Sequence, residues 1–233
     1  MIRTARLSAT AAAIAIAVAA GAALGHGDVA PQAVDTSALP PVGEEWLIEN
    51  PYRAEAAGED VWAKAVEIGA SGYNQNCARC HGLEAVSGGL APDLRFLEAE
   101  EYGDEWYVER YRHGYTQNGT TKMPAFGELL GQEAGWAIRT YIETRPDDVA
   151  MEDAADELTA LRDDFQGYAA DASSADAEAA RTRLTEIADG IGTLSGAPVA
   201  DSIAWRASHL IDGTEEGYRA AAEVLTIGLS AAQ

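Results

Sequence analysis

Apolar residues recur along most of the chain at the three- and four-residue spacing of amphipathic helices. In the C-terminal third this spacing produces three stripes: Leu158, Leu161, Phe165 and Tyr168; then Leu184, Ile187, Ile191 and Leu194; then Tyr218, Ala222, Leu225 and Leu229. Gly196-Ala197-Pro198 separates the second helix from a further helix expected near 199–210. We expect three or four helices here, with Ser173 or Ser174 and Thr214 as N-caps. After residue 25, no stretch shows an alternation of apolar and polar residues strong enough to predict a β-strand. The sequence therefore predicts an all-α fold class.

The middle of the chain, from about residue 58 to 145, consists of short helical patterns separated by loops rich in Gly and Pro. Asp60 is placed to cap a first helix. A second helix is expected from Glu105 to His113, where Gly114 ends it. A third is expected over 132–144, because the residue before Pro146 avoids the helical region.

Residues 1–25 have the features of a secretory signal peptide. Arg3 and Arg6 precede an apolar stretch over 7–24, and small residues up to Gly25 offer a cleavage site. The alternative is an uncleaved anchor helix, but the stretch is mostly alanine and shorter than the roughly 20 apolar residues of a span. The sequence therefore predicts export to the periplasm, cleavage near Gly25, and no membrane span afterwards.

Residues 26–56 are rich in Pro, Gly and acids, and predict an extended arm over a domain, with Trp46, Leu47 and Ile48 as possible tethers. Residues 147–233 differ in composition, with 18 acids, five arginines and no lysine. The predicted domains are therefore a signal peptide (1–25), an arm (26–56), a central domain (57–146) and an acidic helical C-terminal segment (147–233).

The chain of 233 residues carries 38 acids and 16 Lys plus Arg, a formal net charge of −22. Removal of Arg3 and Arg6 with the signal peptide would change this from −22 to −24. Such a charge repels phosphate backbones and excludes nucleic-acid binding. It is compatible with docking to a basic partner or with adaptation to high salt.

The segment Cys77-Ala78-Arg79-Cys80-His81 is the signal for covalent haem attachment. Two residues between the cysteines let one turn of chain present both sulfurs to the two vinyl groups of a porphyrin, and the adjacent imidazole then reaches the iron. A two-cysteine redox motif, a structural disulfide and coincidence are the alternatives. A thioredoxin-like motif needs a βαβ context that the helical pattern does not provide.

Six-coordinate iron needs a second ligand from the opposite face of the haem. Met123 is the leading candidate because Pro124 disfavours helix at Met123 and leaves its thioether on an extended loop that can cross a haem face. A core position would be the ordinary alternative for a methionine. The other candidates are His113, which is the strongest rival, then Met151, His26 and His209.

Residues from about 56 to 145 resemble a class I cytochrome c with one haem. Gly69 and Tyr73 lie eight and four residues before Cys77, as in the N-terminal helix of that family, and Ile138 and Tyr141 match its C-terminal helix. The resemblance implies a cytochrome c fold in which the two helices cross at the glycine. It also implies that Pro92 offers its carbonyl to the haem-ligating histidine.

A narrower resemblance covers residues from about 28 to 146. The segments 31–36, 73–76, 107–110, 113–114, 137–139 and 144–145 are similar to periplasmic five-fifty-type cytochromes c that serve quinoprotein ethanol dehydrogenases. This implies a carrier for alcohol oxidation, which accepts electrons from a pyrroloquinoline quinone (PQQ) dependent alcohol dehydrogenase and passes them towards a downstream cytochrome or terminal oxidase. Residues 147–233 resemble no family and depart from that pattern.

The sequence thus predicts a one-electron carrier with one covalent haem c and no catalytic residues of its own. Cys77 and Cys80 would attach the haem, and His81 and Met123 would bind its iron, since a methionine ligand fills the sixth position and raises the reduction potential. Two alternatives are a permanent haem subunit of a dehydrogenase complex and a haem peroxidase or sensor with an open iron site.

Overall fold

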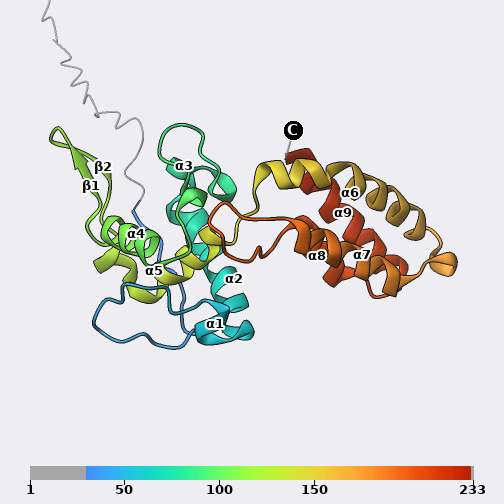
Figure 1. Ribbon diagram of the computed structural model, residues 1–233, viewed down its shortest axis with the longest axis horizontal. Coiled ribbons are helices and arrows are strands. Elements are labelled where there is room, and N and C mark those ends of the chain that lie inside the picture. The colour runs from blue at the N-terminus through green and yellow to red at the C-terminus, as the bar shows by residue number, and fades with distance from the viewer. Residues whose placement is uncertain (1–29, 232–233) are drawn as a thin grey trace, which may run out of the picture. The chain divides into compact units, whose positions relative to one another are not determined.

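The computed structural model describes residues 30–231 and folds them mainly into helices (Figure 1). The predicted signal peptide lies outside these residues. The elements in chain order are α1 (Ala54–Ala57), α2 (Glu59–Asn76), α3 (Ala78–His81), η1 (Leu83–Ala85), η2 (Leu94–Phe96), α4 (Glu101–His113), β1 (Tyr115–Gln117), β2 (Thr120–Met123), α5 (Gly127–Glu143), α6 (Asp148–Tyr168), η3 (Ala172–Ser174), α7 (Ala177–Gly190), α8 (Ile203–Leu210) and α9 (Glu215–Ala231). The predicted all-α class is confirmed, with one small two-stranded sheet among the described residues.

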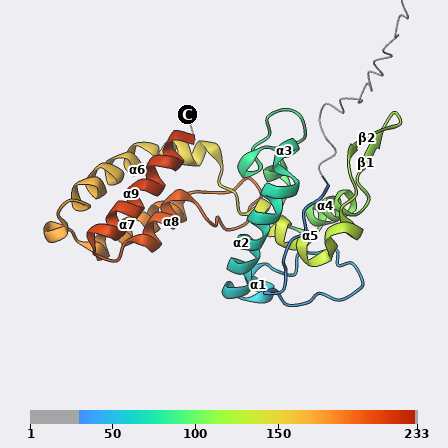
Figure 2. The ribbon, with the colours of Figure 1, turned by 180° about the vertical axis from the view of Figure 1, so that it is seen from behind.

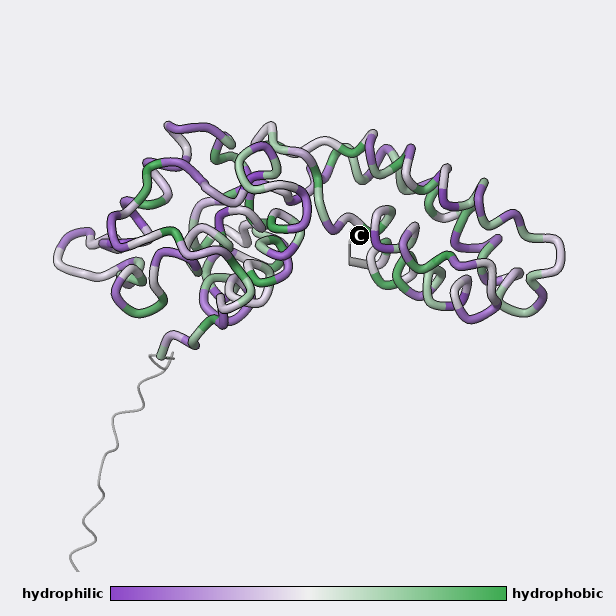
Figure 3. The backbone as a smooth tube through the Cα atoms, turned by 90° about the horizontal axis from the view of Figure 1, so that it is seen from below, coloured by the Kyte–Doolittle hydropathy of each residue, from purple (hydrophilic) through white to green (hydrophobic). Residues whose placement is uncertain are grey.

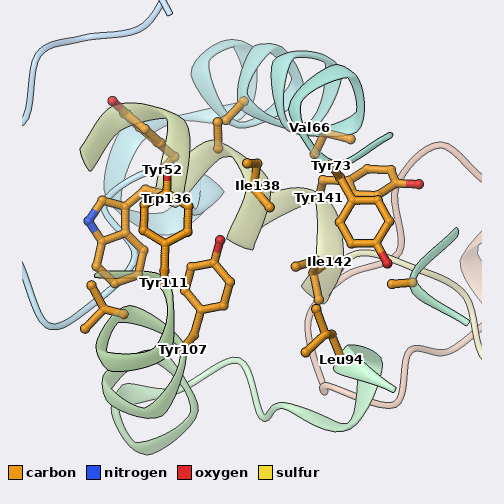
Figure 4. Packing of buried hydrophobic residues seen from close by; sticks show 14 of the residues in the cluster. Tyr52, Val66, Tyr73, Leu94, Tyr107, Tyr111, Trp136, Ile138, Tyr141 and Ile142 are labelled. Atoms are coloured by element: carbon orange, nitrogen blue, oxygen red, sulfur yellow. The ribbon is translucent and has the colours of Figure 1, made fainter. Parts of the chain in front are cut away.

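Helices α2 and α5 pack against each other and form the centre of a first core. A Cβ atom on Gly69 would lie 2.0 Å from the carbonyl oxygen of Ala137, so the backbones touch where the side chain is missing. One turn further along, the rings of Tyr73 and Tyr141 lie 5.3 Å apart between centroids. Figure 4 shows these two rings facing each other at one end of the core. The glycine crossing expected from the class I resemblance is present.

Helix α4 closes the other end of this core with aromatic rings. Tyr107 and Tyr111 stack with centroids 5.8 Å apart, and Tyr107 also lies 6.4 Å from Trp136 of α5 (Figure 4). Both hydroxyls donate to α5, from Tyr107 to the Gly135 carbonyl at 3.0 Å and from Tyr111 to the Gly131 carbonyl at 3.1 Å. These bonds fix α4, and with it the hairpin that follows, against α5.

The arm before α1 lies over this core, and of its predicted tethers Trp46 packs against the core whereas Leu47 and Ile48 do not. Leu39 and Tyr52 are buried, and the ring of Trp46 lies 6.1 Å from Tyr111. Leu47 and Ile48, predicted as tethers, are 37% and 56% exposed. The tethering side chains are therefore spread along the arm instead of forming one apolar cluster.

A buried network of ion pairs joins the end of the arm to two helices. Asp104 is fully buried and accepts from Arg53 and from Arg139 at 2.8 Å each, and from the backbone N–H of Asn50 at 2.8 Å. Arg53 also donates to Glu143 at 2.8 and 3.0 Å. Buried charges are tolerated when each has an opposite partner and hydrogen bonds.

The segment between α4 and α5 forms a β-hairpin, which the sequence analysis did not predict. β1 and β2 pair antiparallel through the turn Asn118-Gly119, where φ is +52° and +76°. Positive φ at both central residues defines the tight turn that favours Asn-Gly. The predicted extended loop carrying Met123 is therefore the second strand of a hairpin.

The C-terminal segment contains α6, α7, α8 and α9 around a second, separate core. Helices α6 and α9 lie side by side in both Figure 1 and Figure 2, and hydrophobic and hydrophilic positions alternate along them in Figure 3. Leu158, Leu184 and Leu225, one from each predicted stripe, are fully buried. Thr214 caps α9 as predicted by accepting from the Gly217 N–H, whereas α7 is capped by Asp176 and not by Ser173 or Ser174.

Within residues 30–231 no helix is both long enough and apolar enough to cross a membrane.

Candidate haem site

The attachment motif follows the last turn of α2. The N–H of Cys77 donates to the Tyr73 carbonyl at 2.8 Å, which completes α2. The N–H groups of Cys80 and His81 then both donate to the Cys77 carbonyl at 3.0 Å. Because this turn is helical, residues three apart lie on one face, so both partly buried thiols are presented together.

His81 is held by a backbone carbonyl. Its Nδ1 lies 2.9 Å from the oxygen of Pro92, as the class I resemblance implied. Donation from Nδ1 leaves Nε2 as the ring nitrogen with a lone pair for a metal. Such a bond also orients the ring and raises its basicity.

The loop that follows His81 is locked in an unusual conformation. Gly82 has a φ of +84°, and a Cβ there would lie 1.8 Å from the Val86 carbonyl oxygen. The Tyr73 hydroxyl donates to the Gly82 carbonyl at 2.8 Å. Glu84 and Ala85 adopt positive φ values of 54° and 63°, which non-glycine residues rarely do. This loop is therefore fixed by its surroundings and not by its own preference.

The environment of the two cysteines does not suit a redox pair. Burial, followed by the charge of Cys80, raises the pKa of the Cys77 thiol to about 12. Reactive dithiols need the opposite, a lowered thiol pKa. The Cys77 thiol therefore lacks the lowered pKa of a reactive redox cysteine.

The hairpin brings Met123 to the same core as the motif. Met123 and Cys77 both pack, partly buried, against the first hydrophobic cluster. Gly114, the cap of α4, has a φ of +68°, and a Cβ on it would lie 2.4 Å from the Met123 carbonyl oxygen. The backbone around Met123 is thus pressed directly against the end of α4.

The rival ligands have other partners. His113 is half exposed, and its Nε2 lies 3.7 Å from Glu109 on the same helix. His209 stacks on Trp205 with ring centroids 4.0 Å apart, and Met151 packs against the second core. His26 lies outside the described residues. These positions favour Met123 among the candidates.

Three large apolar side chains close to the motif in sequence are strongly exposed. Leu83, Leu90 and Phe96 are 72%, 77% and 65% exposed. Apolar surface of this kind marks a ligand or partner site. Together with two thiols, an oriented imidazole and a thioether, it fits a covalently bound haem.

Comparison with known proteins supports this assignment. Residues 64–142 match the family model described as cytochrome C oxidase, cbb3-type, subunit III. Cytochrome c550 of Pseudomonas aeruginosa is 58% identical over 122 residues, which cover 52% of this chain and 82% of that protein. The chain belongs to the cytochrome c550 family. It is accordingly an electron carrier with covalent haem c and not an enzyme.

More distant similarity extends to part of two larger proteins. Quinohemoprotein alcohol dehydrogenase ADH-IIG of Pseudomonas putida is 34% identical over 88 residues, 38% of this chain and 12% of the dehydrogenase. Quinohemoprotein alcohol dehydrogenase ADH IIB of the same species is 31% identical over 97 residues, 41% of this chain and 14% of that protein. No solved structure matches the chain. About half of this chain lies outside its match to the P. aeruginosa cytochrome c550.

Several residues that shape the site were not found from the sequence. Gly114 was recognised as a helix end, but not as the contact surface for Met123. Nothing in the sequence indicated a role for Glu84 or Arg95, and Arg145 was noted only as part of the 144–145 similarity, although each of the three fixes a loop next to His81. The signal available was the Asn118-Gly119 pair, which predicts the hairpin.

Proposed function

We propose that this protein is a periplasmic one-electron carrier that accepts electrons from a PQQ-dependent alcohol dehydrogenase and passes them towards a terminal oxidase. The 58% identity to a cytochrome c550 supports this most directly. The similarity to short stretches of two quinohemoprotein alcohol dehydrogenases adds support, because it joins this kind of haem domain to that chemistry in one chain.

We assign Cys77 and Cys80 to haem attachment and His81 and Met123 to the two axial positions. When bound, haem c supplies reversible one-electron transfer at iron. His81 would bind through Nε2 while Pro92 holds Nδ1, and Met123 would occupy the opposite side and exclude other ligands. The thioether favours the ferrous state and so raises the reduction potential.

We also propose a role for each segment of the chain. Residues 57–146 would carry the haem, and the arm at 26–56 would cover that domain. The acidic helices of 147–233 would form an accessory segment. Residues 1–25 would direct export and be removed near Gly25, since haem c is attached outside the cytoplasm.

The donor is tested by mixing the ferric protein with a purified quinoprotein ethanol dehydrogenase and following haem reduction after ethanol is added. We expect rapid reduction that requires both ethanol and PQQ, with the dehydrogenase lacking PQQ as control. A ferric spectrum that stays unchanged with active dehydrogenase would exclude this donor. If the two proteins instead co-migrate as one stable species, the permanent-subunit alternative replaces the mobile carrier.

The axial assignment is tested by Met123→Ala, with Met151→Ala as a matched methionine control in the second core. Met123→Ala should lose the weak methionine-to-iron charge-transfer band and bind cyanide readily, and Met123→His should stay low-spin at a lower potential. Met151→Ala and His113→Ala should keep the wild-type band. Loss of low-spin character in His113→Ala, with the band intact in Met123→Ala, would overturn the assignment and favour a sensor or peroxidase.

A further inference from the structure

Two segments of the first core adjoin His81. One is the loop 82–86 directly after it, and the other is the segment 92–95, whose Pro92 carbonyl lies 2.9 Å from its Nδ1. Each segment is tied by one buried arginine to the C-terminal segment. No comparison assigns a role to this part of the chain.

The first tie runs through Arg145, whose side chain is 1% exposed. Its guanidinium donates to Glu84 of the loop at 2.8 Å and to the Ala200 carbonyl at 2.8 Å. It also lies 3.6 Å from Asp201. The Tyr141 hydroxyl lies 3.3 Å from the same Glu84 carboxylate, and the guanidinium stacks 4.1 Å above the Tyr141 ring.

The second tie runs through Arg95, which is 4% exposed. It donates to Asp93 at 2.8 and 3.1 Å, and to Asp148 at the start of α6 at 2.8 and 3.0 Å. Asp93 directly follows Pro92. The Arg95 guanidinium therefore makes one bidentate pair with Asp93 and a second with Asp148 of the C-terminal segment. Bidentate pairs are the strongest form of contact between arginine and a carboxylate.

Backbone bonds place the linker between α7 and α8 alongside these ties. The Asp147 N–H donates to the Gly192 carbonyl at 2.9 Å, and the Ala200 N–H donates to the Thr144 carbonyl at 3.1 Å. The Ala99 N–H donates to the Ser195 carbonyl at 2.9 Å. The linker that appeared to be only a break between helices is thus attached to residues 99 and 143–147.

We propose that the C-terminal segment clamps the two segments that adjoin His81, with Arg95 and Arg145 as positioning residues. Through Arg95 it fixes the Pro92 carbonyl, and through Arg145 it fixes the loop after His81. The hydrogen bond to Nδ1 sets the basicity of an iron-bound histidine, so this clamp contributes to the reduction potential. The proposal rests on the proposed axial role of His81.

The test changes only the C-terminal side of each tie. Asp148→Asn and Asp201→Asn are combined in the full-length haem-loaded protein. Both side chains are partly exposed, and Asp201 has a φ of +56°, which asparagine tolerates. The control combines Glu152→Gln and Asp153→Asn, two exposed acids of α6, and removes the same charge without touching either arginine.

Two quantities are measured: hydrogen exchange of the backbone amides in residues 82–97, and the reduction potential. Losing the charge of Asp148 from its bidentate pair with Arg95, and the charge of Asp201 at 3.6 Å from Arg145, should speed exchange in this segment about threefold to tenfold. The control should exchange at the wild-type rate. The potential should shift further in Asp148→Asn/Asp201→Asn than in the control.

Exchange that rises only within residues 147–210, with 82–97 unchanged, would show that the segment is attached without clamping the site. A potential that moves equally in both double variants would reflect the lost charge alone, and would likewise overturn the proposal. Neither result bears on whether His81 binds the iron, because the spectra of the Met123 and His113 variants decide the axial assignment separately.

Discussion

Replacing Gly114 with alanine should loosen Met123 without changing any iron ligand. Gly114 has a φ of +68° and a ψ of −162°, a conformation open essentially to glycine alone. An alanine Cβ there would lie 2.4 Å from the Met123 carbonyl oxygen and 2.8 Å from the Ala125 nitrogen. Both atoms are backbone, so neither can rotate out of the way.

The size of the effect follows from these contacts. An ordinary Cβ contact needs about 3.4 Å or more, so the strand carrying Met123 must move by about 1.0 Å or the α4 end must unwind. Holding alanine in the native conformation costs about 1–3 kcal/mol. Since a displaced strand relieves that strain, the population with Met123 off the iron should rise about 5-fold to 100-fold or more.

The assay is cyanide binding to the ferric protein, together with the intensity of the methionine-to-iron band. Gly114→Ala should bind cyanide about tenfold more tightly or better, with a weakened band. Gly119→Ala is the matched control. Gly119 also has a positive φ, +76°, in the hairpin turn, but a Cβ there meets nothing within 4 Å.

Wild-type cyanide affinity in Gly114→Ala would refute the reasoning, because the backbone contact would then not hold Met123. An equal gain in Gly119→Ala would also refute it, since general weakening of the hairpin would explain both. A urea titration of each variant checks that the comparison is made on folded protein.

Four further predictions concern haem attachment, stability, the pH dependence of stability, and docking. Cys77→Ala combined with Cys80→Ala should leave no haem on the polypeptide after denaturing electrophoresis, and retained haem stain would contradict the assignment. Asp104→Ala should lower the free energy of unfolding in urea by about 3–5 kcal/mol, because it removes one of the two carboxylates that Arg53 and Arg139 share and leaves them only Glu143; a loss below about 1 kcal/mol would show that the buried network is dispensable. Partial burial alone would raise the pKa of the Asp93 carboxyl, but hydrogen bonds from Arg95 lower it below its ordinary value. The stability this adds is present above about pH 4 and is lost as pH falls through the lower folded value, so Asp93→Asn should flatten the acid limb of a stability–pH curve. The rate of electron transfer with the physiological donor should fall as salt rises, given the net charge of −22, and a flat salt profile would indicate apolar docking or salt adaptation.

The helical framework could be predicted from the sequence because apolar spacing records which face each helix buries. The observed α4 ends at His113 before Gly114, and α9 starts after Thr214, as the sequence indicates. Helix starts were less accurate: α2 begins after Gly58 without a side-chain cap, and Asp60 lies inside its first turn. Helix termini depend on single local bonds, which periodicity does not encode.

The hairpin could not be predicted from hydrophobic periodicity, because its strands contain only three and four residues, all exposed or partly exposed. Such short strands bury no face, so they leave no alternating pattern to detect. The turn chemistry was the only local signal. The consequence for the site was small, since an extended strand and an extended loop both carry Met123 outside a helix.

The buried charges could not be predicted because their partners lie far apart in sequence. Arg139 and Asp104 are both fully buried and 35 residues apart, and Arg145 meets Glu84 across 61 residues. A reading based on apolar periodicity assigns every such residue to the solvent face. Only the folded structure shows that each of these guanidinium groups donates hydrogen bonds to a carboxylate in place of water.

This placement changes how the net charge should be understood. Arg95, Arg139 and Arg145 are each at most 4% exposed, whereas most acidic residues of the described chain lie at the surface. The cytochrome thus uses a share of its scarce positive charge to join helices and loops inside the protein. Asp104 and Glu143 are buried as well, so three buried arginines less two buried acids leave the surface one charge more negative than the composition implies. The acids at the surface should steer the protein towards a basic docking face, while Arg95 and Arg145 act on the structure next to His81.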